Sequence, residues 1–250
     1  MNISAVIITK NEERNIERCL KSLQGIVDEI IIVDSFSTDA TKEICEKYDV
    51  KFFQQEWLGY AEQKNYANSL SANDVILSID ADEALSPKLQ QSLLTLNATD
   101  RQNFVYQINR LINYCGKWIY HCGWYPDKKI RLFNRNTAKW TGAIHEALSF
   151  PNDTEVISLK GDLYHYSYYS IEEHIVQANK YSTLAAEEYF KKNKKYSIIT
   201  LLFKFTERFI CDYYFKGGFL DGFYGFVICK INAMTAFLKY VKLRQLHKTT

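Results

Sequence analysis

The sequence predicts an α/β protein with a mostly parallel, Rossmann-like sheet flanked by helices, followed by a helical C-terminal extension. Short apolar runs alternate with amphipathic stretches through the first hundred residues, as they do in consecutive βαβ units. After about residue 103 the runs become shorter and rich in aromatic residues. From residue 191 onward the chain is apolar and basic, which predicts a separate helical and aromatic extension.

In the first hundred residues we expect four strands, each followed by a helix. The strands are short, mostly apolar runs at residues 4–9, 29–34, 50–53 and 75–79. The first helix opens near Asn11 and buries one face. That face carries Ile16, Leu20 and Leu23, and the later helices cover 38–48, 60–70 and 87–96. The GxGxxG motif is missing, so a dinucleotide site is unsupported.

The middle of the chain is expected to extend this sheet and to build the other wall of a cleft. Its aromatic-rich strands cover residues 104–108, 117–119, 130–133 and 155–159. A long helix is expected over 171–192. The domain boundaries therefore fall near residues 100 and 168, which gives segments 1–100, 101–168 and 169–250.

Charge is distributed unevenly along the 250 residues. Residues 1–190 carry 19 Lys and Arg against 26 Asp and Glu, whereas 191–250 carry 12 against 3. A basic, aromatic tail favours an anionic partner. Residues 222–238 are mostly apolar but contain Lys230 and Asn232, so an interfacial helix fits better than a transmembrane span. We expect residues 197–246 to meet an anionic membrane surface and no nucleic acid; packing of the aromatic residues on the body or on a second subunit is the alternative.

The cysteines and the N-terminal residues indicate the cellular compartment of the protein. The six cysteines form no CxxC pair and read as reduced thiols. Cys115, His121 and Cys122 lack a fourth ligand for a structural zinc site. No basic, cleavable leader precedes the first strand, so no signal peptide is expected. These features predict a cytoplasmic protein, peripheral on the inner face of the cytoplasmic membrane.

The end of the strand at 75–79 carries three carboxylates, Asp80, Asp82 and Glu83. In open parallel sheets, ligands bind outside the carboxyl ends of the strands. Side chains at i and i+2 of an extended chain project to the same side, so Asp80 and Asp82 are expected to converge on a divalent cation. The alternative is that Asp82 and Glu83 only precede and cap the helix that starts near Ser86.

Motifs at successive strand ends carry a family resemblance. They are Thr9-Lys10-Asn11-Glu12, Val33-Asp34-Ser35, Gln63-Lys64-Asn65 and Ser78-Ile79-Asp80-Ala81-Asp82-Glu83. In this order they resemble the nucleotide-sugar domain of family 2 glycosyltransferases, whose fold is called GT-A. Five later motifs resemble the bacterial lipopolysaccharide-core glucosyltransferases (WaaE/LgtF type): Gly123-Trp124-Tyr125-Pro126-Asp127, Ile130-Arg131-Leu132-Phe133, Ile144-His145-Glu146, His165-Tyr166-Ser167 and Gly218-Phe219-Leu220-Asp221-Gly222.

The resemblance implies a role for each matching residue. Nucleotide-sugar contacts fall on Thr9, Asn11, Glu12, Asp34, Ser35, Lys64, Asp80, Ala81 and Arg131. Family 2 commonly has two consecutive acids at the uracil-binding strand end, and the second is Ser35 here, so Asp34 or Ser35 would contact the base. Asp82 would ligate Mn²⁺ or Mg²⁺, with Asp80 on the ribose or metal. His165 is either a late metal ligand or a structural histidine.

Sugar transfer with inversion needs a carboxylate to take the proton of the acceptor hydroxyl. Glu146 is the expected base, with Asp127 and Asp162 as substitutes; the alternative pairs Glu146 with Arg131 or Arg135. Trp124, Tyr125 and Trp140 are expected either to stack on a sugar or to lie in the core.

The resemblance implies a metal-dependent transferase that moves glucose from UDP-glucose to a lipopolysaccharide-core or lipid-linked acceptor. Residues 1–100 would bind the nucleotide sugar, 101–168 would form the acceptor side, and 169–250 would be the extension. A nucleotidyltransferase is the rival enzyme, but residues 1–20 contain no glycine for the phosphate loop that such enzymes bring. An inactive, membrane-docked scaffold is the non-enzymatic rival.

Overall fold

The computed structural model describes residues 1–96, 104–142, 146–194 and 198–249. These residues form two compact units. The first consists of Met1–Arg110 with Asp127–Tyr166, and the second of Leu111–Pro126 with Ser167–Thr250.

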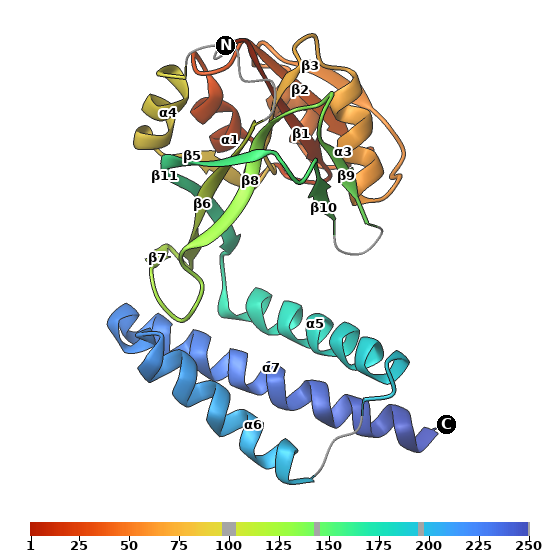
Figure 1. Ribbon diagram of the computed structural model, residues 1–250, viewed down its shortest axis with the longest axis vertical. Helices are drawn as coiled ribbons and strands as arrows, with labels where there is room; N and C mark the ends of the chain where they lie inside the picture. The colour runs from red at the N-terminus through yellow and green to blue at the C-terminus, as the bar shows by residue number, and fades with distance from the viewer. Residues whose placement is uncertain (97–103, 143–145, 195–197, 250) are drawn as a thin grey trace. The chain divides into compact units, whose positions relative to one another are not determined.

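Four parallel strands form one half of the sheet in the first unit (Figure 1). They are β1 (Ile3–Thr9), β2 (Glu29–Asp34), β3 (Lys51–Gln54) and β4 (Val75–Ser78), in the spatial order β3-β2-β1-β4. Thr9 pairs with Asp34 across β1 and β2, so the polar residues that follow these strands emerge at one edge of the sheet. The parallel half predicted from the apolar runs is confirmed.

Helices follow these strands as expected. They are α1 (Ile16–Leu23), α2 (Thr41–Cys45), α3 (Tyr60–Ser69) and α4 (Pro87–Leu94). Ile16, Leu20 and Leu23 are fully buried, as predicted. The helix α2 is shorter than the expected 38–48, because the residues before it form a turn in which Asp39 accepts from the backbone N–H of Thr41 at 3.0 Å.

The remaining strands make the sheet mixed. β8 (Asp127–Asn134) joins β4 antiparallel, and the order continues through β6 (Phe104–Tyr114) and β11 (Glu155–Tyr168) to β5 (Glu83–Leu85). β7 (Lys117–Ile119) pairs with β6, and β9 (Lys139–Thr141) pairs with β10 (Ala147–Ser149) in a separate ribbon. The strands β5, β9 and β10 were not expected, because each forms by pairing with another strand and no pattern within its own residues marks it.

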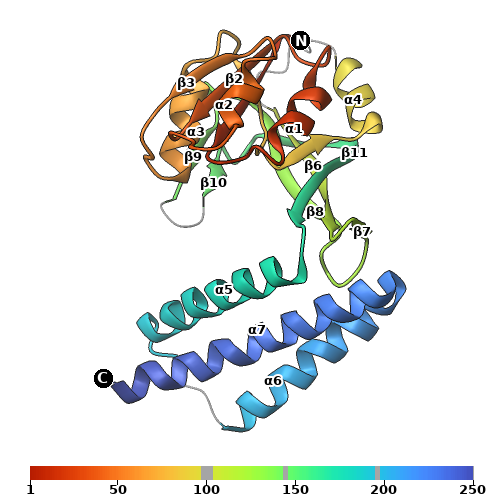
Figure 2. The same cartoon turned by 180° about the vertical axis from the view of Figure 1, so that it is seen from behind.

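The second unit contains three long helices. They are α5 (Ile171–Lys191), α6 (Ile198–Ile210) and α7 (Gly222–Thr249), with α5 and α6 packed along α7 (Figure 2). A π-helical turn (Cys211–Phe215) and a 3₁₀ turn (Gly218–Asp221) connect α6 to α7. None of the helices in the described ranges has the length and hydropathy that a membrane crossing requires.

Aromatic residues form the core of the second unit. Tyr114 is fully buried, and its hydroxyl lies 3.0 Å from Nδ1 of the buried His174. Trp124 stacks on Tyr168 with ring centroids 5.8 Å apart. Trp124 therefore packs within this unit, which agrees with the alternative that it lies in the core.

Candidate active site

The three carboxylates follow β4 in a tight turn. The strand ends at Ser78, and the backbone N–H of Glu83 donates to the Asp80 carbonyl at 2.9 Å, which reverses the chain into β5. The extended conformation assumed for residues 80–82 is therefore wrong, and Asp80 and Asp82 contact different side chains. The helix after the turn is capped by Ser86, whose hydroxyl accepts from the backbone N–H of Leu89, so neither Asp82 nor Glu83 caps it.

Asp80 lies between two cations. Arg131 Nη2 is 2.6 Å from one of its carboxylate oxygens, and Lys64 Nζ is 3.1 Å from the other. Burial opposes ionisation of this carboxyl, but the facing Arg131 and Lys64 outweigh it and hold its pKa well below the usual range. Asp80 is therefore an anion at neutral pH.

Glu83, to which the sequence assigned no role, holds both Arg131 and the backbone of Asp80 in place. Its side chain is buried; one oxygen accepts from Arg131 Nη2 at 2.6 Å and the other from the backbone N–H of Asp80 at 3.0 Å. Arg110 Nη1 lies 3.7 Å away. Arg131 is itself buried, so it lies between Asp80 and Glu83. The only sequence signal was an acid at the start of an apolar, strand-like run.

Asp82 faces His165, and pairing of β5 with β11 produces this contact. His165 stands opposite Glu83 in that pairing, and the backbone N–H of Tyr166 donates to the Asp82 carbonyl at 3.0 Å. His165 Nε2 then lies 3.0 Å from an Asp82 carboxylate oxygen. Within the described ranges, no three His, Cys, Asp or Glu side chains gather as a metal-ligand group. The pair still supplies two metal-ligand types: the Asp82 carboxylate, which suits Mn²⁺ and Mg²⁺, and the His165 imidazole, which suits other transition metals.

Glu146 lies next to Lys64. The Lys64 amino group is 3.4 Å from a Glu146 oxygen and also lies 4.7 Å from the centroid of the Trp140 ring. The cation that Glu146 contacts is thus Lys64, and not Arg131 or Arg135, the partners that the alternative interpretation gave it. Trp140 is buried and packs against Phe133, as expected for a core residue. Ile144 and His145 of the same motif lie outside the described residues.

The substitute bases have contacts of their own. Asp127 lies 2.7 Å from Arg110 and 3.0 Å from Lys129. Burial opposes ionisation of Asp127, but these cations outweigh it and lower its pKa. Asp162 belongs to β11, where its backbone N–H donates to the Ser86 hydroxyl at 3.0 Å.

The loop after β1 brings Thr9 and Glu12 toward the same strand edge. The Thr9 hydroxyl is buried and has no hydrogen-bond partner among the described residues. Burial raises the pKa of Glu12; the hydrogen bond from Asn15 opposes the shift, and the nearby Asp82 carboxylate adds to it. Asn11 instead ties two loops together, since its amide oxygen accepts from the backbone N–H of Thr38 at 2.8 Å.

The two expected uracil contacts are buried and hydrogen-bonded within the protein. Asp34 accepts from the backbone N–H of Ser37 at 2.9 Å, from the Ser37 hydroxyl and from Gln54. The Ser35 hydroxyl accepts from Gln63 Nε2 at 3.2 Å. In this conformation both residues stabilise the end of β2.

A cavity of about 540 Å³ opens at the carboxyl ends of β1 and β4. Its lining residues are Ile8, Thr9, Lys10, Glu12, Trp57, Tyr60, Asp80, Ala81 and Asp82. Five predicted site residues therefore meet here. The others are not part of the lining: Asn11, Asp34, Ser35, Lys64, Arg131, Glu146 and His165. Sequence reasoning missed Trp57 and Tyr60, which are exposed and contact each other edge to face at 4.8 Å. The signal that was available was an aromatic residue in a polar loop, Trp57, close to a second one at the start of the expected helix, Tyr60.

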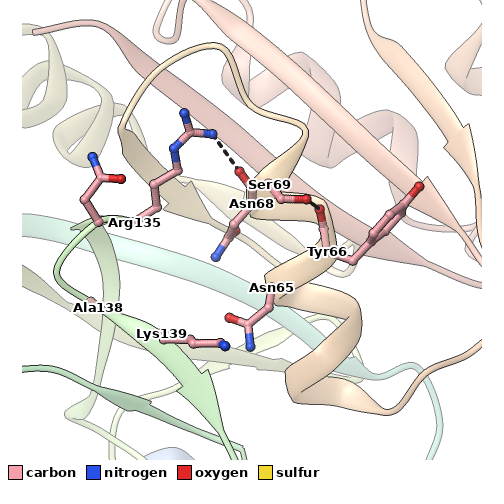
Figure 3. A pocket seen from close by; sticks show the side chains of 8 residues that line it. Asn65, Tyr66, Asn68, Ser69, Arg135, Ala138 and Lys139 are labelled. Carbon is pink, nitrogen blue, oxygen red and sulfur yellow. Dashed lines mark hydrogen bonds between the residues drawn. The ribbon is translucent and has the colours of Figure 1, made fainter.

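A second cavity, of about 560 Å³, lies between the end of α3 and the start of β9 (Figure 3). Its lining consists of Asn65, Tyr66, Asn68, Ser69, Arg135, Asn136, Ala138 and Lys139. The dashed lines in the figure mark two hydrogen bonds: Arg135 donates to the Asn68 carbonyl at 3.0 Å, and the Ser69 hydroxyl donates to the Tyr66 carbonyl at 2.6 Å. None of the predicted site residues lines this cavity, so the candidate active site is the cavity at Asp80 and Asp82.

Residues 4–153 match the family described as "Glycosyl transferase family 2". The chain belongs to this family. An "Uncharacterized glycosyltransferase RT0209" of Rickettsia typhi is 39% identical over 254 residues, which cover 98% of this chain and 87% of the relative. The "Lipopolysaccharide core biosynthesis glycosyltransferase LpsC" of Rhizobium meliloti is 30% identical and covers 98% of this chain and 93% of its own length. The resemblance to family 2 is confirmed.

The family match agrees with the architecture. The mixed α/β sheet flanked by helices is the GT-A fold that the resemblance implied, and the helical C-terminal extension is present. The crystal structure of S. aureus TarS 1-349 in complex with UDP has 16% sequence identity and a TM-score of 0.46, with 88% of this chain and 74% of that chain covered. The candidate active site of this family 2 glycosyltransferase lies at the carboxyl ends of β1 and β4.

Proposed function

We propose that this family 2 glycosyltransferase moves a sugar, with inversion at the anomeric carbon, from a UDP-sugar to a lipopolysaccharide-core or lipid-linked saccharide. We propose UDP-glucose as the first donor to test, with glucose as the transferred sugar. The observation that carries the proposal is the cavity at the strand ends, which joins Asp80 and Asp82 with an aromatic rim. A nucleotidyltransferase becomes less favoured, because the family match covers the donor half of the chain.

The cavity supports binding of a nucleoside diphosphate sugar. Trp57 and Tyr60 offer flat apolar faces on which a base can stack. The buried Thr9 hydroxyl can exchange a hydrogen bond with a ligand, which would satisfy its hydrogen-bonding capacity. Lys10 adds a cation to the lining, next to the acids that a sugar hydroxyl would contact.

The donor set supports a divalent cation, Mn²⁺ or Mg²⁺, as the cofactor. Asp82 and His165 are the residues that would hold it, and Asp80 is the nearest further carboxylate of the same cavity. A bound cation would supply Lewis-acid stabilisation for the charge that develops on the departing diphosphate.

The charged residues around Asp80 fix the position of its carboxylate. Arg131 and Lys64 hold the two Asp80 oxygens, and Glu83 holds Arg131. We expected Arg131 to contact the nucleotide sugar directly, but burial between two carboxylates favours a positioning role for it. Asp80 is thereby kept ionised and oriented toward a ribose or sugar hydroxyl.

Glu146 remains the proposed base for the acceptor hydroxyl. Its carboxylate is partly exposed and shares Lys64 with Asp80, so a single cation links the proposed base to the donor cavity. As base, Glu146 accepts the acceptor proton while the acceptor oxygen attacks the anomeric carbon. The name of the Rhizobium relative, which covers nearly all of this chain, supports a saccharide acceptor of the lipopolysaccharide core.

A panel of UDP-sugars, assayed with and without Mn²⁺, tests the proposal. The wild type is expected to release UDP from one donor in the presence of a core saccharide. Glu146→Gln is expected to lose about a hundredfold or more in kcat while UDP binding persists. His165→Ala is expected to weaken Mn²⁺ binding, measured by calorimetry in the absence of donor. Absence of donor binding by the wild type, or full activity of Glu146→Gln, would overturn the respective assignment.

The same panel separates the inactive-scaffold alternative. A scaffold that retained the domain without turnover would bind UDP yet release none from any donor. Catalytic release of UDP by the wild type would exclude that alternative.

A further inference from the structure

The connection between α6 and α7 carries large apolar side chains that face solvent. We call residues 214–223 the aromatic turn. Five of its ten residues are large, apolar and exposed: Tyr214 61%, Phe215 83%, Phe219 49%, Leu220 60% and Phe223 69%. An exposed apolar surface of this density marks an interaction site in a protein that does not bury it by itself.

Two buried aspartates hold the aromatic turn in place. Asp221 accepts from the backbone N–H of His121 at 2.8 Å and contacts the His121 ring nitrogen at 3.1 Å. Asp212 accepts from Arg208 at 2.6 Å and from Lys216 at 2.8 Å. The turn is therefore fixed by charge-assisted hydrogen bonds on its inner side.

The inner side also has no room for the aromatic rings. Gly225, in the first turns of α7, lies so close to the 3₁₀ turn that an added Cβ would stand 1.9 Å from the Gly218 carbonyl oxygen. A Cβ added at Gly218 would stand 2.6 Å from the sulfur of Cys229. Because the backbone is packed this tightly, the large side chains of the aromatic turn are directed outward.

The exposed charges beside the aromatic turn are almost all positive. The exposed Arg208 and Lys216 share the single buried Asp212 and so keep a net positive charge, to which the exposed Lys230 adds. The sequence of α7 contains five Lys and Arg and no Asp or Glu. The single acid in the sequence of α6, Glu207, pairs with Lys204 at 2.6 Å. This charge and these side chains favour a partner that is anionic and can accept apolar side chains.

We propose that the aromatic turn docks into the interfacial layer of an anionic lipid bilayer. Aromatic side chains favour the boundary between headgroups and acyl chains, and nearby Lys and Arg add attraction to anionic lipid. Docking would bring the enzyme to the surface that holds a lipid-anchored acceptor. This role of the docking rests on the proposed function. The contacts that support it lie within the second unit alone.

Vesicle co-sedimentation with the full chain tests the inference. The wild type is expected to bind phosphatidylcholine vesicles that contain phosphatidylglycerol, to bind pure phosphatidylcholine vesicles less, and to lose binding as salt rises. The double variant Phe215→Ser/Phe223→Ser is expected to bind the anionic vesicles about tenfold more weakly or less. Both residues are mostly exposed, so the variant is expected to keep the wild-type unfolding temperature.

Ile175 and Val176 of α5 provide the matched control, since both are exposed apolar residues of the same unit. The variant Ile175→Ser/Val176→Ser is expected to bind vesicles like the wild type. Equal loss in the control, undiminished binding of the Phe215/Phe223 variant, or no vesicle binding by the wild type would overturn the proposal. A wild-type dimer that the Phe215/Phe223 variant converts to a monomer, or wild-type binding to an oligonucleotide in place of vesicles, would overturn it too.

UDP binding, measured by calorimetry on each variant, separates this proposal from the proposed function. Vesicle binding without UDP or UDP-sugar binding would remove the proposed function and leave the docking surface standing. UDP binding without vesicle binding would remove the docking surface and leave the proposed function standing.

Discussion

Arg131 lies 2.6 Å from Asp80 and, through the same nitrogen, 2.6 Å from Glu83. Asp80 lines the candidate active-site cavity, whereas Glu83 is buried beneath it. Arg131 therefore links an acid that can meet a ligand to an acid that cannot. The backbone N–H of Asp80 donates back to Glu83 and closes the arrangement.

This arrangement predicts that Glu83→Gln destabilises the protein through the charge left on Arg131. Removal of one partner from a buried ion pair costs about 3 kcal/mol or more, and the remaining contact with Asp80 keeps the loss near that lower value. Urea unfolding measures the effect. Glu188→Gln, which removes the same charge from an exposed pair with Lys192, is the control and is expected to leave the midpoint unchanged. Equal midpoints for the two variants would contradict the prediction.

Asp80 predicts a pH dependence of stability. Its pKa is lowered in the folded protein, because Arg131 and Lys64 outweigh burial. A carboxyl with a lowered folded pKa stabilises the fold above its unfolded pKa, about 4, and loses that contribution as pH falls through the folded value. The stability difference between wild type and Asp80→Asn is thus expected to be constant near neutral pH and to shrink below about pH 4. Urea titrations across this range measure it, and a difference that grows toward acid pH would refute it.

The parallel strands were predictable because their signal is local. Every residue from Ile30 to Val33 is apolar and buried, so the composition of this run alone identifies it as a strand covered on both faces. The same holds for the buried face of α1. The strand β5 was not predictable, because its three residues depend on pairing with β11, about eighty residues later in the chain.

The site was predicted in part for a related reason. Motif order placed Thr9, Glu12, Asp80 and Asp82 at one sheet edge, and the structure brings them to one cavity. The turn at residues 80–83 depends on Glu83 and Arg131, which meet only after the antiparallel strands have joined the sheet. No pattern within one segment reports such a contact, so Glu83 remained without a role and Arg131 was expected to face the ligand.

His174 predicts a second acid-sensitive step, within the second unit. It is buried against Tyr114, and burial lowers its pKa to about 4. The unfolded imidazole has a pKa near 6.5, so the unfolded chain binds a proton first and stability falls as pH drops from about 6.5 to 4. The loss amounts to about 3 kcal/mol at the acid end. His174→Gln is expected to flatten this slope in urea unfolding between pH 7 and pH 5.

Nuclear magnetic resonance gives an independent reading of the same group. The His174 ring is expected to remain neutral down to pH 5 in the folded protein, because its pKa is lowered to about 4. A folded-state titration midpoint near 6.5 would contradict the assignment and the slope derived from it.

Trp57 is expected to contribute to nucleotide binding through its exposed ring at the cavity rim. Stacking of a base on an aromatic side chain is worth about 1–3 kcal/mol, so Trp57→Ala is expected to weaken UDP binding about tenfold. Leu58→Ala is the matched control, because Leu58 is equally exposed in the same loop but does not line the cavity. Its backbone N–H, which donates to Gln63 at 3.2 Å, is unaffected by the substitution. Calorimetry with UDP measures both variants, and equal affinities would show that the rim does not hold the base.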